Sequence, residues 1–457
     1  MTLNKQYTNE FTRIIEQLDG DIDSRRAAFA YMENSTAIVH YELAESSFVP
    51  RLFDRATYDE MKHVAETTHT ICEKVMRHYL DDADYRQIFE YDERLADLIM
   101  IPQRYDALLP FARFDIFLNE DDLTSGFCEL NADGSSGMNE DRELNISLAN
   151  SKTMQEFKKN HTVQTSDLFY PWVDEFIRIY NTFENRVEHP TFAIVDFMEN
   201  AVVDEFKVYC TYFARRGYPC IVADVRDLVF EDGVLRTKSG RRVDAIWRRS
   251  VTNDILNHWD ESQPLIEATR AGAVALIGSF AGHIVHDKQI FDALFHPKTR
   301  AFLTQEECDF VDAHVPQTKF LDDAHINLDE VRANKDSWII KPTDQYGAAD
   351  VYAGQMHTQE EWEAIVSKFA NGAAGAPFLV QTYLTPYETD VLPIVPDMLE
   401  RDAADIPRQL RPYKNLNGLY VFNGTFAGVF SRLGPNAIIS NPMGDLTSAT
   451  IWVDCDL

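Results

Sequence analysis

The chain has 457 residues, of which 45% are hydrophobic and 26% charged, and its formal charge is -31 at pH 7. This length can bury a large core, and the composition is that of a globular protein without low-complexity tracts. The negative charge argues against nucleic acid or an anionic membrane as a partner, because both attract basic surfaces.

The sequence gives no indication of secretion or of a membrane span. The first ten residues are polar and lack the apolar segment of a signal peptide. The longest apolar run, at about residues 271–282, is too short to cross a bilayer. The six cysteines are scattered without a C-x-x-C pair, which is typical of a reducing compartment. We therefore expect a cytoplasmic protein.

The N-terminal region is predicted to be helical. Apolar residues recur at helical spacing between Tyr7 and Leu18, and again between Met61 and Tyr79. The segment 57–60, Thr-Tyr-Asp-Glu, has the pattern of a capping box and predicts the start of the second helix. Both apolar stripes are typical of core packing.

Two strand-like segments, residues 112–118 and 126–131, flank a turn-rich stretch at 119–122 and predict a hairpin. Because strand side chains alternate between faces, one face should be apolar and the other polar. The polar face would carry Arg113, Asp115, Glu129 and Asn131, and the apolar face Phe114, Ile116, Cys128 and Leu130.

Asp115 and Glu129 are expected to pair across this hairpin. Two carboxylates about 4 Å apart repel by roughly 4 kcal/mol at an effective dielectric constant of about 20, and a divalent cation would remove that cost. Oxygen ligands of this kind suit magnesium. A solvated polar face on an amphipathic hairpin explains the hairpin alone equally well.

The next segment, residues 131–140, is rich in Gly, Ser, Asn and Asp. Such a segment predicts a loop that can bring backbone amides and hydroxyls close to a ligand. A plain surface loop has a similar composition. Direct attachment to the strand that carries Glu129 and Asn131 favours a functional loop.

A β-α-β unit is predicted from residue 191 onward, with strands at 192–197 and 219–223 around a helix at 204–216. The unit lacks a G-x-G-x-x-G turn, so it does not predict a dinucleotide site.

Strands and turns then alternate as far as Arg249. The two arginines at the end of this stretch have two interpretations. Either Arg248 or Arg249 faces an anionic ligand, or a structural salt bridge holds the end of the strand. A helix is expected over 256–271, and His283 and His286 are expected to be polar loop residues.

The last third contains a second polar segment. Lys288 lies at the start of a predicted helix, where a nearby phosphate would offset the unfavourable helix dipole. Residues 338–342 predict an apolar strand that places Lys341 at its end, and a buried lysine needs an anion. A loop at 344–347, a strand at 378–383 and a hairpin at 419–430 with an Asn-Gly turn follow.

Together these segments resemble the circularly permuted branch of the ATP-grasp superfamily, in particular the glutathionylspermidine synthetase-like and eukaryotic glutathione synthetase-like ligases. In ordinary ATP-grasp proteins the metal-binding E-x-N segment follows the K-P strand, whereas here it precedes that strand, as in the permuted branch. The motifs cover about residues 110–450. They are Arg113-Phe114-Asp115, Glu129-Leu130-Asn131-Ala132-Asp133, Asp287-Lys288, Trp338-Ile339-Ile340-Lys341-Pro342, Val380-Gln381 and the Gly428 to Arg432 hairpin.

The resemblance implies a mixed α+β and α/β fold, a circularly permuted ATP-grasp fold with a helical N-terminal region and an inserted, pre-ATP-grasp-like α/β domain. We expect the helical region at 1–110 and the discontinuous catalytic region at 111–190 and 286–457. The inserted domain, on the substrate side, would occupy 191–285.

The resemblance also implies a role for each motif residue. Magnesium would bind Asp115, Glu129 and Asn131, with a third carboxylate near Asp344. Arg113 would orient the acyl substrate and stabilise its phosphorylated form. The phosphates and base of ATP would contact Lys288, Lys341, Gly347, Gln381 and Tyr383, and the substrate pocket would include Asp133, Ser135, Ser136 and Arg432.

The activity implied is that of an ADP-forming carboxylate-amine ligase that uses ATP and magnesium and forms an amide through an acyl phosphate. Its partners would be a small carboxylate, such as an amino acid or a short peptide, and an amine. Gly347 is the only glycine in the loop after Lys341, where related proteins usually have several glycines. A nucleotide-binding protein without turnover is therefore one alternative, and a small-molecule kinase of the same superfamily is another. The sequence does not determine the oligomeric state.

Overall fold

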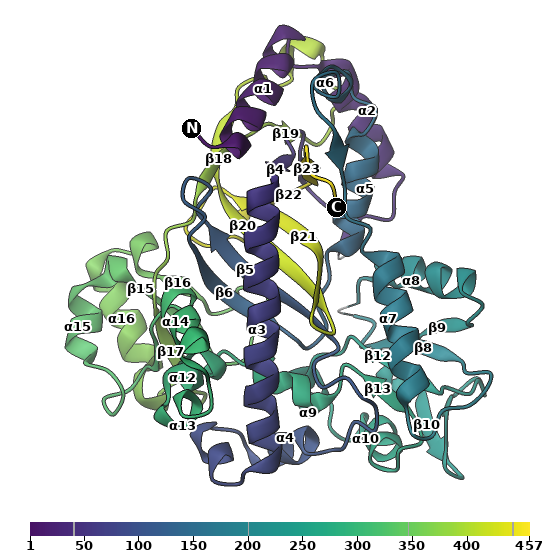
Figure 1. Cartoon of the computed structure of the whole chain (residues 1–457). Coiled ribbons are helices and arrows are strands. Elements are labelled where there is room, and N and C mark those ends of the chain that lie inside the picture. The colour runs from purple at the N-terminus through teal and green to yellow at the C-terminus, as the bar shows by residue number, and fades with distance from the viewer. Residues whose placement is uncertain (40–41, 200, 346, 441–442) are drawn as a thin grey trace.

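The computed structural model describes residues 1–39, 42–199, 201–345, 347–440 and 443–457. Its centre is a long sheet in the strand order β19-β3-β22-β21-β20-β5-β6, with β18 paired to β20 (Figure 1). Its strands are antiparallel except for β22 and β3, which pair in parallel. The strands are β3 (Ser46–Ser47), β5 (Phe111–Leu118), β6 (Ser125–Asn131), β18 (Glu388–Val391), β19 (Pro393–Ile394), β20 (Arg411–Phe422), β21 (Thr425–Gly434) and β22 (Leu446–Ser448).

The hairpin β5–β6 forms as predicted and pairs Asp115 with Glu129. A bulge follows this pair, so Ile116 pairs with Phe127 and Cys128 becomes the extra residue. The prediction that Cys128 joins the apolar face is wrong, because the bulge interrupts the alternation and Cys128 lines a cavity instead.

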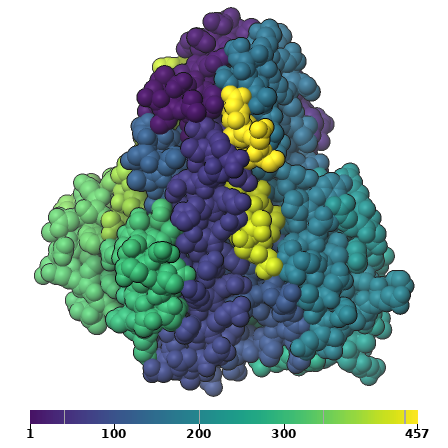
Figure 2. All heavy atoms as spheres, in the orientation of Figure 1, coloured from purple at the N-terminus to yellow at the C-terminus, as the bar shows by residue number. Residues whose placement is uncertain are grey.

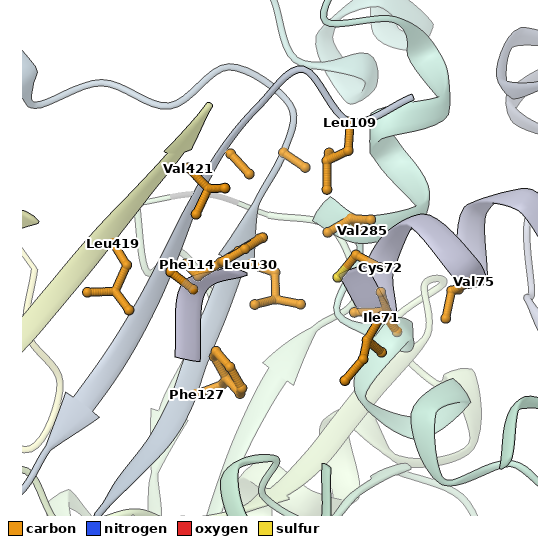
Figure 3. Packing of buried hydrophobic residues seen from close by; sticks show 14 of the residues in the cluster. Ile71, Cys72, Val75, Leu109, Phe114, Phe127, Leu130, Val285, Leu419 and Val421 are labelled. Atoms are coloured by element: carbon orange, nitrogen blue, oxygen red, sulfur yellow. The ribbon is translucent and has the colours of Figure 1, made fainter. Parts of the chain in front are cut away.

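Helix α3 (Arg55–Asp81) crosses the apolar face of this sheet. Figure 3 shows Ile71, Cys72 and Val75 of α3 in the same cluster as Phe114 and Leu130 of the hairpin. The helix begins before the predicted capping box: Asp54 is its N-cap and accepts a hydrogen bond from the Thr57 backbone amide. An aspartate at this position satisfies an amide that the helix leaves unpaired.

Helices α1, α2, α5 and α6 lie in the upper part of the molecule in Figure 1, near the C-terminal strand, whereas α4 lies at the bottom. Figure 2 shows the same face with the C-terminal residues packed against α3. A three-stranded sheet, β4-β23-β7, joins the two ends of the chain. The elements are α1 (Leu3–Gln17), α2 (Ile22–Glu33), β1 (Ile38–Val39), β2 (Glu42–Leu43), β4 (Arg51–Phe53), α4 (Glu93–Ile99), α5 (Met138–Leu148), α6 (Lys152–Phe157), β7 (Val163–Gln164) and β23 (Thr450–Val453).

A parallel sheet in the order β13-β12-β8-β9 lies on the right in Figure 1. The predicted β-α-β unit is confirmed as β8, α8 and β9. The single helix predicted over 256–271 is wrong, because Pro264 lies in the first turn of a separate helix, a position where proline is tolerated. The elements are α7 (Phe169–Thr182), β8 (Phe192–Asp196), α8 (Val203–Arg215), β9 (Cys220–Asp224), β10 (Leu228–Glu231), β11 (Val234–Thr237), β12 (Ala245–Arg248), α9 (Thr252–Asn257), α10 (Gln263–Arg270) and β13 (Ala275–Ile277).

A second antiparallel sheet, β14-β17-β15-β16, lies on the opposite side of the central sheet in Figure 1. Helices α15 and α16 cover it and share a core with Ile340 and Val380. The elements are α11 (His283–His286), α12 (Gln289–Phe295), α13 (Pro297–Arg300), α14 (Gln305–His314), β14 (Thr318–Phe320), α15 (Leu328–Ala333), β15 (Trp338–Pro342), β16 (Tyr352–Ala353), α16 (Gln359–Phe369) and β17 (Phe378–Thr382).

Within these described residues, no helix combines the length and apolar character needed to cross a membrane.

Candidate functional site

One cavity of about 470 Å³ receives residues from the central sheet, the parallel sheet and the second antiparallel sheet. This volume lies within the usual range of small-molecule sites. Asp115 and Asp344 are absent from the cavity lining, and the other predicted site residues all belong to it: Arg113, Glu129, Asn131, Asp133, Ser135, Ser136, Lys288, Lys341, Gly347, Gln381, Tyr383 and Arg432.

Two buried lysines face the cavity from the side of the second antiparallel sheet. The Lys341 ammonium group donates to the Cys128 carbonyl at 3.1 Å and to Gln381 Oε1 at 2.9 Å. Lys288 Nζ donates to the Gln345 carbonyl at 3.0 Å. Burial lowers the pKa of Lys341 below its ordinary value, and the positive charge of Lys288 lowers it further. An anion bound between the two lysines would relieve this repulsion.

Glu129 lies among these cations at the end of β6. Asn131 Nδ2 donates to Glu129 Oε1 at 3.2 Å, so the two predicted magnesium ligands are adjacent. Burial would raise the pKa of the Glu129 carboxyl, but Lys288 and Arg113 outweigh burial and lower the pKa to about 2. Glu129 is therefore ionised over the whole physiological range, as a metal ligand must be.

The described residues contain no cluster of three or more His, Cys, Asp or Glu side chains that could hold a metal by themselves. Glu129 and Asn131 offer oxygen atoms, which magnesium prefers, and magnesium usually takes its other ligands from water and substrate phosphates. The two side chains therefore fit a magnesium ion that is held jointly with a nucleotide.

Asp115 has different contacts from those expected of a metal ligand. Arg113 donates to both of its carboxylate oxygens, from Nε at 2.7 Å and from Nη2 at 2.9 Å. The remaining Arg113 nitrogen, Nη1, donates to the Ser136 carbonyl at 2.6 Å. Asp115 thus holds the Arg113 guanidinium in one orientation at the cavity wall.

Gly418 of β20 makes room for this ion pair, and sequence analysis did not identify it. A Cβ atom on Gly418 would lie 2.7 Å from Arg113 Cδ and 2.9 Å from Asp115 Oδ1. The available signal was a glycine in the interior of a strand, which often marks a close approach.

Sequence analysis assigned Asp133, Ser135 and Ser136 of the loop after β6 to the substrate pocket, but the structure gives Asp133 a different role. Ser135 and Ser136 line the cavity. Asp133 also borders it, but its carboxylate pairs with Arg248 and accepts from the Thr252 amide at 2.6 Å. Burial would raise the pKa of Asp133, yet Arg248 holds it well below its usual range. Asp133 therefore anchors the loop to the parallel sheet.

The predicted nucleotide contacts lie together at the other side. Tyr383 donates from its hydroxyl to the Ala437 carbonyl at 3.2 Å, and its amide donates to the Ser337 carbonyl at 2.8 Å. Ile339 and Ile438 supply apolar lining beside it. Gly347 borders the same cavity with a φ of 68°, and Tyr346 of the predicted loop 344–347 lies outside the described residues.

Arg432 reaches the cavity from β21, where its Nε lies 3.1 Å from Asp445 Oδ2. Burial raises the pKa of Asp445 to about 6, although Arg432 opposes this shift. Arg432 therefore retains a protein partner.

The structure distinguishes the two neighbouring arginines that the sequence left open. Arg248 is structural, because it also donates to the Ser250 carbonyl at 2.6 Å and the Gly278 carbonyl at 3.1 Å. Arg249 lines the cavity, and its Nε and Nη1 atoms are buried without a hydrogen-bond partner among the described residues.

His283 and His286 form a short buried helix, α11, and are not the polar loop residues predicted. The ring of His283 lies 3.7 Å from Asp287 and 3.9 Å from both Asp133 and Asp344. Burial would lower the pKa of His283, but the nearby carboxylates of Asp133, Asp287 and Asp344 raise it to about 10. The carboxylate of Asp344 thus faces a charged histidine.

Comparisons with known proteins agree with the motif order. Residues 211–429 match the family model described as circularly permuted ATP-grasp type 2, and no curated protein sequence matches the chain. A glutathione synthetase-like effector from Globodera pallida has a TM-score of 0.62 and 11% identity, covering 94% of this chain and 96% of that one. "Putative gamma-glutamylcysteine synthetase" from Methylobacillus flagellatus KT has a TM-score of 0.41 and 10% identity, covering 84% of this chain and 88% of its own. The first of these likenesses is one of fold.

Proposed function

We propose that this chain, of which residues 211–429 match the circularly permuted ATP-grasp type 2 family, is an ADP-forming carboxylate-amine ligase. Its substrates are ATP, an amino acid or small peptide that supplies the carboxylate, and an amine. The observation that carries the proposal is the convergence of Glu129 and Asn131 with two buried lysines. Lys341 donates to the carbonyl of Cys128, a residue 213 positions away in the sequence.

The lysine side of the cavity suits a nucleotide triphosphate. Lys288 and Lys341 provide two buried positive charges for phosphate oxygens, and the segment 382–384 lines the cavity where the base would lie beside Tyr383. Magnesium held by Glu129 and Asn131 would neutralise further phosphate charge.

The chemistry needs charge neutralisation more than it needs a protein nucleophile. A substrate carboxylate oxygen attacks the γ-phosphorus, and the bond to ADP breaks, which gives an acyl phosphate and ADP. An amine then attacks the acyl carbon, phosphate leaves and the nitrogen loses a proton. Both partners of the first step are anions, so fixed cations lower its barrier.

Arg113 is suited to the acyl group. Its guanidinium is held at the cavity wall by Asp115 and by the Ser136 carbonyl, so its position is set before substrate binds. A planar group that is fixed in this way stabilises negative charge on the carboxylate without reorganising.

The test is phosphate release from magnesium-ATP with pooled amino acids, short peptides and amines, followed by mass spectrometry of the products. Release that requires both a carboxylate and an amine, together with a new amide, supports the ligase. Tight ATP binding without release would indicate a nucleotide-binding protein, and phosphate found on a product would indicate a kinase. Either of these two results would overturn the proposal.

A further inference from the structure

The parallel sheet brings Asp196 and Arg249 to one edge, where both line the cavity. Asp196 is the last residue of β8, and Arg249 directly follows β12, its parallel neighbour. From β8 the chain moves outward to β9, and β12 lies on the other side of β8. The gap between β8 and β12 is therefore the topological switch point, where open α/β sheets bind ligands beyond the carboxyl ends of their strands.

Arg249 has a charge that the described protein atoms do not satisfy by hydrogen bonding. Arg249 is only 7% exposed, and its Nε and Nη1 atoms have no hydrogen-bond partner within the described part of the chain. The guanidinium lies 5.1 Å from the Trp247 ring centroid and 5.5 Å from that of Phe206, which fixes its plane without using its N–H groups. Buried donors of this kind are costly unless a ligand or water accepts from them.

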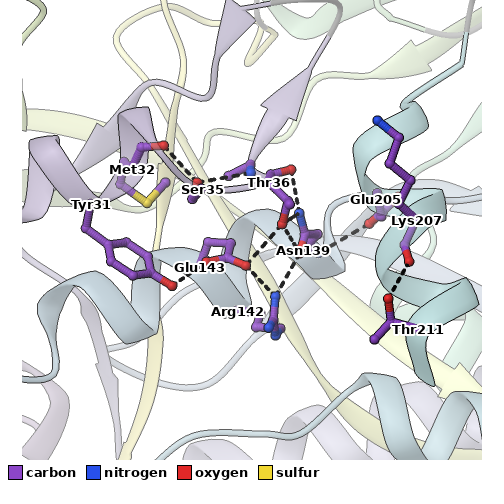
Figure 4. Close-up of polar contacts among 11 residues, drawn as sticks. Tyr31, Met32, Ser35, Thr36, Asn139, Arg142, Glu143, Glu205, Lys207 and Thr211 are labelled. Atoms are coloured by element: carbon purple, nitrogen blue, oxygen red, sulfur yellow. Dashed lines mark hydrogen bonds and ion pairs between the residues drawn. The ribbon is translucent and has the colours of Figure 1, made fainter. Parts of the chain in front are cut away.

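Glu205 is a buried acid that interacts electrostatically with Arg249, but no hydrogen bond joins the two side chains in the described part of the chain. The Oε2 atom of Glu205 is likewise buried without a hydrogen-bond partner among the described residues. Glu205 Oε1 accepts from the backbone amides of Gly137 and Asn139, each at 3.2 Å, at the start of α5. Figure 4 shows the contact between Glu205 and Asn139. Glu205 does not line the cavity, whereas Arg249 does.

Acidic side chains share the cavity lining with Arg249. Asp196, Asp254 and Glu140 all line it, and Asp196 interacts electrostatically with both Arg249 and Asp254. Asp196 is 5% exposed and accepts from the Phe197 amide at 2.9 Å. A simple dicarboxylate would place negative charge against these acids, whereas an ammonium group would be attracted to them.

The loop at 134–136 connects this edge to the reacting groups. Its Ser136 carbonyl accepts from Arg113, and a Cβ on Gly134 would lie 3.3 Å from Arg249 Nη1. Gly134 has a φ of 90°, so glycine is favoured there for its backbone as well as for space. Arg113 and Arg249 thus flank the same short loop.

We propose that the switch-point edge binds the α-amino acid head group of a substrate, with its carboxylate on Arg249 and its ammonium group on Asp196. The role of this substrate in amide formation rests on the proposed function, whereas binding of the amino acid to Arg249 and Asp196 does not require ligase activity. The proposal selects an amino acid or an amino-acid-terminated peptide over a polyamine as the substrate at this edge.

Isothermal titration calorimetry of the full chain with each of the twenty free amino acids tests this proposal. We expect at least one to bind. Its α-carboxamide and its des-amino analogue should each bind roughly 10- to 100-fold more weakly, because each lacks one charge-assisted contact. Putrescine should bind more weakly than the amino acid. Absence of amino acid binding, or tighter binding of putrescine, would overturn the proposal.

Two variants assign the contacts. Arg249→Gln should weaken binding of the amino acid by a similar factor. This variant should also bind the amino acid and its α-carboxamide with nearly equal affinity. Asp196→Asn should abolish the preference over the des-amino analogue. Arg216→Gln is the matched control, because Arg216 is a surface residue paired with Asp174. Undiminished binding by Arg249→Gln would overturn the assignment.

Magnesium-ATP binding, measured on the same variants, separates this proposal from the ligase proposal. Arg249→Gln should keep its affinity for ATP and its thermal unfolding temperature, which also shows that the variant is folded. If Arg249→Gln does not fold, Arg249→Lys replaces it, since a point charge cannot reproduce a bidentate contact. Wild-type affinity for the amino acid in a folded Arg249→Lys protein would count against the proposal. Amino acid binding that depends on Arg249 in a protein without phosphate release would overturn the ligase and retain this site.

Discussion

The two sides of the cavity differ in how their charges are paired. On the side of the second antiparallel sheet, Lys341 and Lys288 donate to protein carbonyls, and Asn131 donates to Glu129. On the side of the parallel sheet, Arg249 is as deeply buried but has no such bonds among the described residues. The polar groups of the lysine side thus hold each other in place by hydrogen bonds, whereas in our proposal the hydrogen bonds of Arg249 are supplied by a ligand.

The largest effect is expected from Glu129→Gln, which tests the lysine side. The variant loses a negative charge from a cluster of cations, so magnesium binding weakens and phosphate release should fall by roughly 10³-fold. Steady-state phosphate release measures this, and the amino acid affinity of the arginine side should not change. Glu360→Gln, an exposed glutamate on α16, is the control. Turnover at the wild-type rate in Glu129→Gln would contradict the metal assignment.

Gly418→Ala should act through Arg113 and lower kcat by about 10²-fold, because a displacement of about 1 Å can cost this much. The added Cβ would lie 2.7 Å from Arg113 Cδ, so the guanidinium must move. Arg113→Lys alone should be at least as severe.

The double variant decides whether the two residues act together. In the Arg113→Lys background, Gly418→Ala should cost little more, since the group it displaces is already gone. Fully additive losses in kcat would show that Gly418 does not act by positioning Arg113.

Lys288→Met should weaken ATP binding by roughly 10- to 100-fold, the cost of losing one charged hydrogen bond. Calorimetric titration with magnesium-ATP measures the loss. Lys62→Met, on the exposed face of α3, is the control. Because the two sides bind different groups, amino acid binding should stay within about twofold of wild type; a parallel loss of both would show that the sides are not separate.

The smallest effect is a pH dependence on the arginine side. Burial raises the pKa of Asp196 to about 6; Asp254 and Asp224 support this shift, and Arg249 and the Phe197 amide oppose it. As pH falls through 6 the carboxyl gains a proton and loses its attraction for an ammonium group. Amino acid affinity should therefore drop by up to about 10-fold from pH 7 to pH 5, when about one-tenth of the carboxyl is ionised.

Asp196→Asn provides the comparison for that titration. Its affinity for the amino acid should be lower at pH 7 and nearly constant down to pH 5. A wild-type affinity that is flat over this range, or an equally steep fall in Asp196→Asn, would assign the ammonium contact to another group.

The sequence determined the local elements and the order of the motifs. Period-two and period-3.6 patterns predicted β5, β6, β15 and α3, because these periods depend on neighbouring residues only. The Asn423-Gly424 turn is formed as predicted, with both residues at positive φ. The permuted motif order predicted the fold that the comparisons confirm.

Tertiary structure decided which polar side chains face the cavity. A bulge against β5 turned Cys128 toward the cavity, and a contact with a distant segment engaged Asp133 with Arg248. Arg113 and Asp115 are two residues apart on β5, and Gly418 of β20 leaves the space for their ion pair. Arg248 and Arg249 are adjacent in sequence, yet only the second lacks hydrogen-bond partners for buried nitrogens among the described residues. The physical reason is that the state of a buried charge depends on the groups packed around it, and the partners of Asp133 come from residues more than a hundred positions away.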